Sequence, residues 1–280
     1  MKKERVDILL VEQGLIETRE KAKRAVMAGL VYADEERLNK PGEKIPADTT
    51  LTLKGQIMPY VSRGGYKLEK ALKEFHLNLQ DKIVLDIGAS TGGFTDCALQ
   101  NGAKFSYALD VGYNQLAWKL RQDERVIVME RTNFRYASPS DFTHGLPQFA
   151  SIDVSFISLK LILPALKAIL VPNSDVAALI KPQFEAGKEQ VGKKGIIRDH
   201  KVHEEVIVKI MEFALAQGYD VEQITFSPIK GGNGNIEFLI HLKWYGEREK
   251  GENHSTNSPA LVVTNAHTEL KQVGKGDNEE

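Results

Sequence analysis

The chain has 280 residues, of which 42% are hydrophobic and 27% are charged, and its formal net charge is −1. This composition is typical of a globular protein and excludes a fibrous or largely disordered chain. No apolar run approaches the roughly 20 residues that a membrane-spanning helix needs, and Glu4, Asp7 and Glu12 interrupt any N-terminal signal segment. The single cysteine, Cys97, excludes an internal disulfide and a cysteine-based zinc cluster, so a cytoplasmic location is expected.

The overall charge is unevenly distributed along the chain. Residues 246–280 carry four basic and seven acidic side chains, whereas the rest of the chain carries 33 basic and 31 acidic ones. The acidic balance therefore comes from the last segment. The body of the protein is neutral to slightly basic, which leaves room for a local nucleic-acid-binding patch.

The first 55 residues are expected to form a small α+β domain. Apolar residues at helical spacing predict one helix that closes at Gly14 and a second that begins after Thr18 and closes at Gly29. Short strands are expected at 30–32 and 50–53. Residues 56–62 then form a linker to the next domain.

Residues 63–245 are expected to form a larger α/β domain, because apolar strand candidates alternate there with helical patterns. The strand candidates are Ile83–Ile87, Tyr107–Val111, Val126–Glu130, Ser151–Ser155, Val176–Ile180, Gln223–Ser227 and Ile236–Leu242. This alternation predicts a doubly wound, mostly parallel seven-stranded sheet, with a tight antiparallel connection between the last two strands. Residues 246–280 show little periodicity and are predicted to be disordered.

A glycine-rich turn follows the first of these strands and opens a helix. Its ligand-binding candidates are Asp86, Gly88, Ser90, Gly92, Gly93 and Phe94. The next strand ends in Asp110, which is placed to accept hydrogen bonds from ribose hydroxyls, and Asn133 follows the third strand, where it could touch an adenine. The arrangement resembles the S-adenosylmethionine site of class I (Rossmann-like) methyltransferases. A turn that serves packing alone and a nicotinamide dehydrogenase remain as alternatives.

The residues at the end of the fourth strand limit which chemical groups could accept the methyl group. Enzymes that methylate exocyclic base amines have an Asp/Asn-Pro-Pro-aromatic stretch there, whereas this chain has Asp153-Val154-Ser155-Phe156. Methylation at carbon 5 of a pyrimidine needs a cysteine nucleophile, and Cys97 is expected to be buried in a helix. Both kinds of base methylation are therefore disfavoured.

Four charged residues fit a different reaction. Asp153 and Lys181 end two neighbouring strands, so they are expected to converge beside the glycine turn, where they could also be a structural ion pair. The order Lys67, Asp153, Lys181, Glu237 resembles the catalytic tetrad of the FtsJ-like ribose 2′-O-methyltransferases. The resemblance implies methyl transfer to a ribose 2′-hydroxyl, with Lys181 either taking the proton or only orienting the hydroxyl.

The N-terminal unit resembles the αL-type RNA-binding domain of ribosomal protein S4, and the fusion of the two domains resembles the TlyA family. The stretch from Phe184 to Asp199 is its most specific local signature, and Tyr60 keeps the aromatic position of the family's linker motif without its basic residue. The resemblance implies S-adenosylmethionine as cofactor and a cytidine of ribosomal RNA, within ribosomal subunits, as substrate. It implies no metal in the chemistry and no membrane partner.

Basic residues in two regions are candidates for RNA binding. In the N-terminal unit they are Arg5, Arg19, Lys21, Lys23, Arg24 and Lys40; in the loop after Lys181 they are Lys188, Lys193, Lys194 and Arg198. Taken alone they would be a solvated charged surface, and the S4-type resemblance favours the RNA interpretation.

Two other functions stay open at this stage. One is a membrane-active haemolysin, for which residues 159–171 are the most apolar segment, although two lysines and a proline interrupt it. The other is a non-catalytic RNA-binding or ribosome assembly factor that keeps the fold. The intact set of four charged residues argues against this second alternative.

Overall fold

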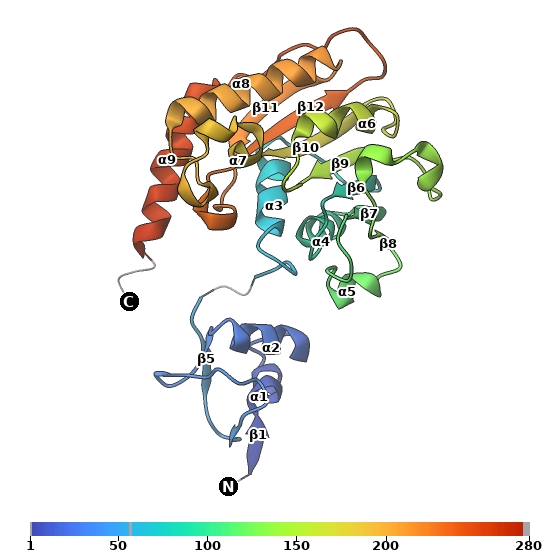
Figure 1. The fold of residues 1–280 in the computed structure, drawn as a ribbon. Helices are drawn as coiled ribbons and strands as arrows, with labels where there is room; N and C mark the ends of the chain where they lie inside the picture. The colour runs from blue at the N-terminus through green and yellow to red at the C-terminus, as the bar shows by residue number, and fades with distance from the viewer. Residues whose placement is uncertain (1, 56–57, 277–280) are drawn as a thin grey trace. The chain divides into compact units, whose positions relative to one another are not determined.

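The structure is a computed structural model that describes residues 2–55 and 58–276 (Figure 1). The chain divides into two compact units, one up to Pro59 and one from Tyr60 onward, and each is described by itself. Among the described residues, no helix combines the length and the apolar character that crossing a bilayer would require.

The N-terminal unit is a small α+β fold built on two helices, α1 (Val6–Glu12) and α2 (Arg19–Met27). Its strands form one antiparallel pair and one three-stranded antiparallel sheet; they are β1 (Lys3–Arg5), β2 (Val31–Ala33), β3 (Glu36–Arg37), β4 (Lys44–Pro46) and β5 (Leu51–Leu53). As expected, Thr18 caps α2 by accepting a hydrogen bond from the Lys21 amide. The apolar faces of the two helices share one core with Val31 and Leu51.

The second unit is organised around a mixed sheet, seven-stranded within the described residues, in the order β11-β12-β10-β9-β6-β7-β8. Only β12 runs antiparallel to its neighbours, which confirms the predicted doubly wound, mostly parallel sheet. The strands are β6 (Ile83–Ile87), β7 (Phe105–Leu109), β8 (Val126–Met129), β9 (Phe149–Ile152), β10 (Ser174–Ile180), β11 (Asp220–Phe226) and β12 (Phe238–Trp244). All seven residues of β10 are buried, since helices cover both faces of the sheet.

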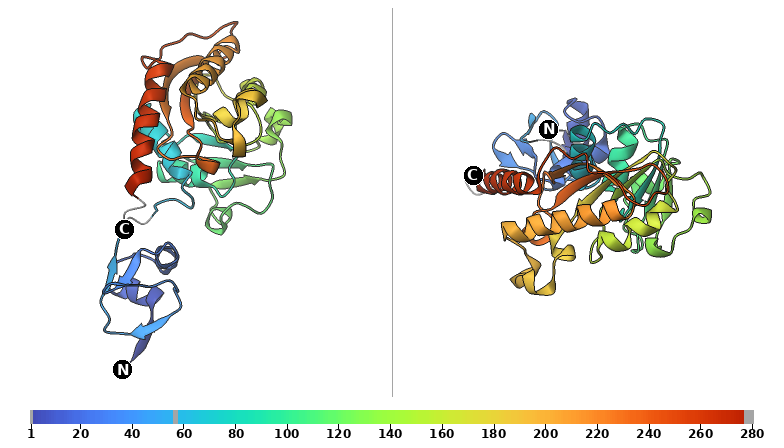
Figure 2. Two further views of the ribbon diagram at one scale, coloured as in Figure 1. Left: turned by 60° about the vertical axis from the view of Figure 1, so that its left-hand side comes forward. Right: turned by 90° about the horizontal axis from the view of Figure 1, so that it is seen from above.

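Helices lie on both faces of this sheet (Figure 2), and each face carries its own apolar core. Helices α3 (Gly65–Glu74), α4 (Gly93–Gln100) and α5 (Trp118–Arg121) pack on one face. Helices α6 (Leu163–Lys167) and α8 (His200–Ala216) cover the other, and the short α7 (Pro182–Glu185) follows β10. Asp199 begins α8 by accepting a hydrogen bond from the Lys201 amide at 2.8 Å.

The C-terminal segment differs from the prediction of disorder over 246–280. Residues Pro259–Gly276 form helix α9, which packs against α8 and the edge strand β11. Four of its apolar side chains enter the core: Val262, Val263, Ala266 and Leu270. Their spacing of three to four residues is the helical signal that the polar composition of the segment obscured. The residues from 277 onward lie outside the described part.

Two further details differ from expectation. The proposed linker 56–62 is partly structured, because Tyr60 is buried in the second unit and its hydroxyl donates to Glu69 at 2.7 Å; residues 56–57 lie outside the described residues. The connection between β11 and β12 is not a tight turn. It runs from Ser227 to Glu237 and contains the single 3-10 turn Gly232–Gly234, and its length allows it to form a wall of the site described next.

Candidate active site

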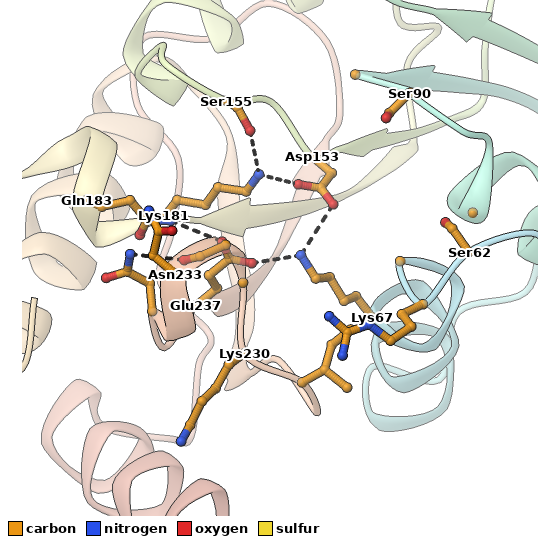
Figure 3. A pocket seen from close by; sticks show the side chains of 18 of the residues that line it. Ser62, Lys67, Ser90, Asp153, Ser155, Lys181, Gln183, Lys230, Asn233 and Glu237 are labelled. Carbon is orange, nitrogen blue, oxygen red and sulfur yellow. Dashed lines mark hydrogen bonds and ion pairs between the residues drawn. The ribbon is translucent and has the colours of Figure 1, made fainter. Parts of the chain in front are cut away.

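A cavity of about 1040 Å³ lies at the carboxyl ends of β6, β9 and β10 (Figure 3). The glycine-rich turn forms one wall, and the connection between β11 and β12 forms another. Ligands of open α/β sheets bind at this edge, because the loops there diverge from the strand ends. The cavity is therefore where the fold itself places a substrate site.

Four charged side chains meet in this cavity from four different elements. Lys67 comes from the first turn of α3, Asp153 follows β9, Lys181 follows β10, and Glu237 directly precedes β12. Nζ of Lys181 lies 2.5 Å from Oδ1 of Asp153, and Nζ of Lys67 lies 3.4 Å from Oδ2 of the same carboxylate. Nζ of Lys67 also lies 2.7 Å from Oε2 of Glu237. The structure thus brings all four predicted residues into one network.

The electrostatics of this network are those of three ion pairs, two of which share the partly buried carboxylate of Asp153. Lys67 and Lys181 are each 7% exposed, and Glu237 is 1% exposed. Burial lowers the pKa of Lys67, but the carboxylates of Asp153 and Glu237 outweigh burial, so the pKa of Lys67 is raised above its ordinary value. Lys67 therefore remains an ammonium at neutral pH.

Two polar residues that the sequence analysis did not select complete the network. Lys181 donates a hydrogen bond to Oγ of Ser155 at 3.2 Å, and Nε2 of Gln183 donates to Oε1 of Glu237 at 3.1 Å. Ser155 lies two residues after Asp153, and Gln183 lies two residues after Lys181. Both residues could have been selected from the sequence, because they lie close along the chain to strand ends that carry tetrad residues.

The glycine turn passes unusually close to the Asp153 backbone. Gly88 has a φ of +89°, and a Cβ at this position would lie 2.6 Å from the Asp153 carbonyl oxygen. A glycine is required here because of the positive φ and because the Asp153 backbone leaves no room for a side chain. Gly93 similarly lets α4 approach the segment before α3, since its Cβ would lie 2.8 Å from the Gly65 amide nitrogen.

The predicted cofactor residues divide into two groups. Gly88, Ser90, Gly93 and Phe94 line the cavity, whereas Asp86, Gly92, Asp110 and Asn133 are not part of its lining. Gly92 lies where α4 begins, with a φ of +95°, against the side chains of Leu116 and Leu120.

Asp86 lies beneath the turn and is not part of the cavity lining. It is 1% exposed, and its carboxylate accepts hydrogen bonds from the amide and hydroxyl of Thr95 and from the hydroxyl of Ser151. Burial raises the pKa of Asp86 to about 7, although these hydrogen bonds act in the opposite direction. Its position ties the end of β6 to α4 and so fixes the turn between them.

Asp110 adjoins the turn from the end of the neighbouring strand β7, whereas Asn133 follows β8 and bonds locally. Oδ2 of Asp110 accepts a hydrogen bond from the Ser90 amide at 2.8 Å, and Oδ1 accepts from the Gly112 amide at 2.6 Å. The side chain of Asn133 accepts from the Arg135 amide at 3.2 Å. Asp110 therefore shapes the loop that presents Ser90.

Two aromatic rings border the four charged residues. Phe156 is 89% exposed, has a φ of +64°, and lines the cavity immediately after Ser155. Its ring lies 5.0 Å from that of Phe184, and Nζ of Lys181 lies 5.9 Å from the Phe184 ring. An exposed aromatic ring beside buried charges provides a flat face for a planar ligand group.

The sequence-predicted RNA-binding residues of the N-terminal unit centre on Asp7. This fully buried carboxylate accepts hydrogen bonds from the guanidinium groups of Arg5 and Arg19, each at 2.9 Å, so residues from β1 and α2 converge. The hydrogen bond from Arg5 lowers the pKa of Asp7 to about 2. Lys21 pairs instead with Glu17 at 2.5 Å.

The other predicted RNA-binding residues are mainly surface groups. Lys23 is partly buried. Lys40 is exposed, and so are the loop residues Lys188, Lys194 and Arg198. Arg24 is partly buried on α2. The side chain of Lys193 lies outside the described part of the chain.

Cys97 lies in α4 and is buried, and burial raises its pKa to about 12. A thiol in this state is a poor nucleophile at neutral pH. The geometry agrees with the sequence-based argument against methylation at carbon 5 of a pyrimidine.

Comparison with known proteins identifies both units. Residues 60–244 match the FtsJ-like methyltransferase family, and residues 4–51 match the S4 domain family. The chain is 67% identical to YqxC of Bacillus subtilis, provisionally named an rRNA methyltransferase, over 97% of this chain and 96% of that one. It is 39% identical to the 16S/23S rRNA (cytidine-2′-O)-methyltransferase TlyA of Mycobacterium tuberculosis, over 87% of this chain and 91% of TlyA.

A solved structure supports the same conclusion. A Streptococcus thermophilus protein, provisionally called a hemolysin, is 59% identical and superposes with a TM-score of 0.77, covering 98% of this chain and 99% of that one. The chain is a member of the TlyA family, in which an FtsJ-like methyltransferase domain follows an S4 domain.

Proposed function

We propose that this enzyme transfers a methyl group from S-adenosylmethionine to the 2′-hydroxyl of a cytidine in ribosomal RNA, within ribosomal subunits in the cytoplasm. The observation that carries the proposal is the network of Lys67, Asp153, Lys181 and Glu237 beside the glycine turn. The cytidine and the ribosomal RNA follow the activity for which the TlyA relative is named.

The residues around the glycine turn fit the cofactor. Gly88, Ser90, Gly93 and Phe94 give the cavity a wall of small residues and backbone beside the tetrad, and the end of β7 carries the Asp110 carboxylate near Ser90. A methyl donor of this kind needs a close backbone approach and an acceptor for its ribose hydroxyls. When bound, it supplies an electrophilic methyl group on sulfur.

The tetrad orients the acceptor oxygen. Nζ of Lys181 has three positions besides its bond to carbon; Asp153 and Ser155 occupy two of them, which leaves the third to face the incoming 2′-hydroxyl. Asp153 fixes Lys181, and Lys67, itself held by Glu237, fixes Asp153 from the other side. Holding the oxygen in line with the methyl group contributes most of the rate, since orientation alone can be worth about 7–11 kcal/mol.

Lys181 is the residue placed to take the proton of the 2′-hydroxyl. Lys67 is unsuited to this role, because its raised pKa keeps it protonated. Lys181 accepts the proton when it enters the reaction as the neutral amine, and the Asp153 carboxylate then stabilises the ammonium that forms. Phe156 offers its exposed ring to the base of the same nucleotide.

RNA contact is proposed for the charged groups of both units. Arg5 and Arg19, fixed by Asp7, present one cationic site, and Lys21, Lys23, Arg24 and Lys40 add charge on the same small unit. In the loop after Lys181 we propose the same role for Lys188, Lys193, Lys194 and Arg198. Phosphate contacts of this kind give affinity and position rather than sequence specificity.

The test is methyl transfer from labelled S-adenosylmethionine to unmodified ribosomal subunits, with free ribosomal RNA for comparison and Lys181→Ala as control. We expect label in a 2′-O-methylnucleoside after digestion to nucleosides, and loss of that label in the variant. Label on a base would contradict the tetrad assignment. Cofactor binding without any transfer would contradict the proposed acceptor and favour the non-catalytic alternative.

A further inference from the structure

A second cavity, of about 510 Å³, adjoins the active-site cavity and is named here the flanking cavity. The two cavities share four lining residues: Lys230, Asn233, Gly234 and Leu270. The walls of the flanking cavity come from the segment before α8, the connection between β11 and β12, and α9. Helix α9 therefore helps to form a site and does not only cover the core.

The lining of the flanking cavity is basic. Arg198, His200, Lys230, His267 and Lys271 contribute to it, and no carboxylate side chain is among the described lining residues. Within the described part of the chain, no ion pair involves Arg198, Lys230 or Lys271. Three exposed cations that are not neutralised by the protein favour an anionic ligand.

One wall of the cavity is built from packed histidines. Nε2 of His267 lies 3.0 Å from Nδ1 of His203, and the His200 ring stacks on the His267 ring with centroids 3.6 Å apart. Burial, followed by the charges of His200, Lys271 and Lys230, lowers the pKa of His267 to about 4. His267 is thus neutral at pH 7 and serves as a rigid wall, while the lysines and Arg198 supply the charge.

Apart from Asn233 and the basic residues, the lining of the flanking cavity is apolar. Ile197, Ile236 and Leu270 are each at most 9% exposed and contribute side chains to the cavity. An apolar wall next to cationic groups matches a nucleotide, whose base and sugar are flat or weakly polar and whose phosphate is charged. A small inorganic anion would use only the cationic part.

We propose that the flanking cavity binds a nucleotide and its backbone phosphate in the substrate RNA, next to the nucleotide whose ribose enters the tetrad. The proposal rests on the proposed function, because it takes RNA as the substrate. Lys230 belongs to both cavities, and Figure 3 shows its side chain extending away from the tetrad toward the pale red helix α9. A continuous strand that leaves the tetrad in this direction meets Lys230, and Lys271 and Arg198 line the same cavity.

The experiment compares the full-length protein with the double variant Lys230→Gln/Lys271→Gln. Both side chains are exposed, so the fold is expected to be retained. Lys209→Gln is the matched control, because Lys209 is an exposed lysine on α8, nine residues beyond the start of that helix. The probe is unmodified ribosomal subunits, and the readout is the dissociation constant at several salt concentrations, measured without catalysis.

We expect the double variant to bind subunits about 5- to 20-fold more weakly at 0.15 M salt. The slope of log K against log salt should be smaller in magnitude by about one to two, because one or two phosphate contacts are lost. The affinity for S-adenosylmethionine and the behaviour of Lys209→Gln stay at the wild-type values. Unchanged affinity and slope in the double variant would overturn the proposal, as would a wild-type protein that does not bind subunits.

Two further results are informative. One distinguishes RNA phosphate from a small anion in the flanking cavity, and the other distinguishes this proposal from the proposed methyl transfer. Saturable binding of inorganic pyrophosphate that the double variant loses, with unchanged affinity for subunits, would assign the cavity to a small anion and overturn the RNA assignment. If the double variant shows the expected loss of affinity and smaller salt slope but wild-type protein places no label in a 2′-O-methylnucleoside, the flanking cavity is supported and the proposed reaction is not.

Discussion

The carboxylate of Asp153 lies 2.5 Å from Nζ of Lys181, and its second oxygen faces a second lysine, so one acidic side chain positions two basic ones. Asp153→Asn keeps the shape but removes the negative charge between the two lysine side chains. We expect kcat to fall about 10²- to 10³-fold, because the acceptor oxygen loses its orienting group. Single-turnover methyl transfer measures this, and a cofactor affinity within threefold of wild type shows that the turn is intact. A kcat above one tenth of the wild-type value would contradict the role of Asp153.

The two lysines of the tetrad are expected to respond differently to arginine. Arginine keeps a positive charge but does not give up its proton at neutral pH. Lys181→Arg should therefore lose activity as fully as Lys181→Ala, about 10³-fold, whereas Lys67→Arg should retain more activity because Lys67 acts as a cation. The measurement is kcat at saturating subunits. A Lys181→Arg variant with more than a tenth of wild-type activity would show that Lys181 orients the hydroxyl without taking its proton.

The close approach of Gly88 to Asp153 predicts a large effect of one added methyl group. Gly88→Ala places a Cβ 2.6 Å from the Asp153 carbonyl oxygen at a φ of +89°, so Asp153 must move. We expect at least a tenfold loss of kcat and a destabilisation of about 1–3 kcal/mol. Gly232→Ala is the matched control in the same cavity, since no atom lies within 4 Å of its added Cβ. Equal losses in both variants would contradict this explanation.

The buried carboxyl of Asp86 predicts a pH-dependent stability. Burial raises its pKa from 3.8 to about 7, so between about pH 4 and 7 the native state binds more protons than the unfolded state. The contribution of Asp86 to stability is complete below the pKa that it has in the unfolded state. It is lost as the pH rises through the pKa that it has in the native state. Asp86→Asn does not titrate, so its stability relative to wild type should rise by on the order of 2–4 kcal/mol from pH 4 to pH 8. Urea unfolding at both pH values tests this, and a difference that stays constant would contradict it.

Helix α9 is expected to be part of the folded core. Ala266 is fully buried in α9, whereas Leu261 on the same helix is 51% exposed. Ala266→Asp should destabilise the second unit by about 3 kcal/mol or more, since it buries an unpaired charge, and Leu261→Asp should change stability by less than about 0.5 kcal/mol. Thermal unfolding of the full chain compares the two variants. Equal stability would show that α9 is dispensable for the core.

Two members of the tetrad could be predicted from the sequence because they end parallel strands, whereas Lys67 and Glu237 were selected through the resemblance to the FtsJ-like methyltransferases. In a doubly wound sheet such ends converge, so Asp153 and Lys181 could be paired before any coordinates were known. The position of Asp86 could not be predicted in the same way. Whether a strand-end carboxylate faces the ligand or the helix below depends on the side chains around it, here Thr95 and Ser151, and these lie on other elements.

Helix α9 was missed for a different reason. Its apolar residues follow helical spacing from Val262 to Leu270, but the preceding segment is rich in Gly, Asn and Ser, and composition was given more weight than periodicity. A helix of this kind is stabilised mainly by the surface that it covers, on α8 and β11, which a local pattern does not contain. The flanking cavity was hidden with it, because His267, Leu270 and Lys271 belong to that helix.

The ion pair between Lys67 and Glu237 joins residues 170 positions apart in the chain. Contacts of such long sequence separation form late in folding, because the intervening chain must first be ordered. Glu237 reaches Lys67 only after β12 has inserted between β10 and β11 and has paired with both strands. Enzymatic activity should therefore return in the slowest refolding phase, so that a partly folded molecule holding the glycine turn would not yet modify RNA.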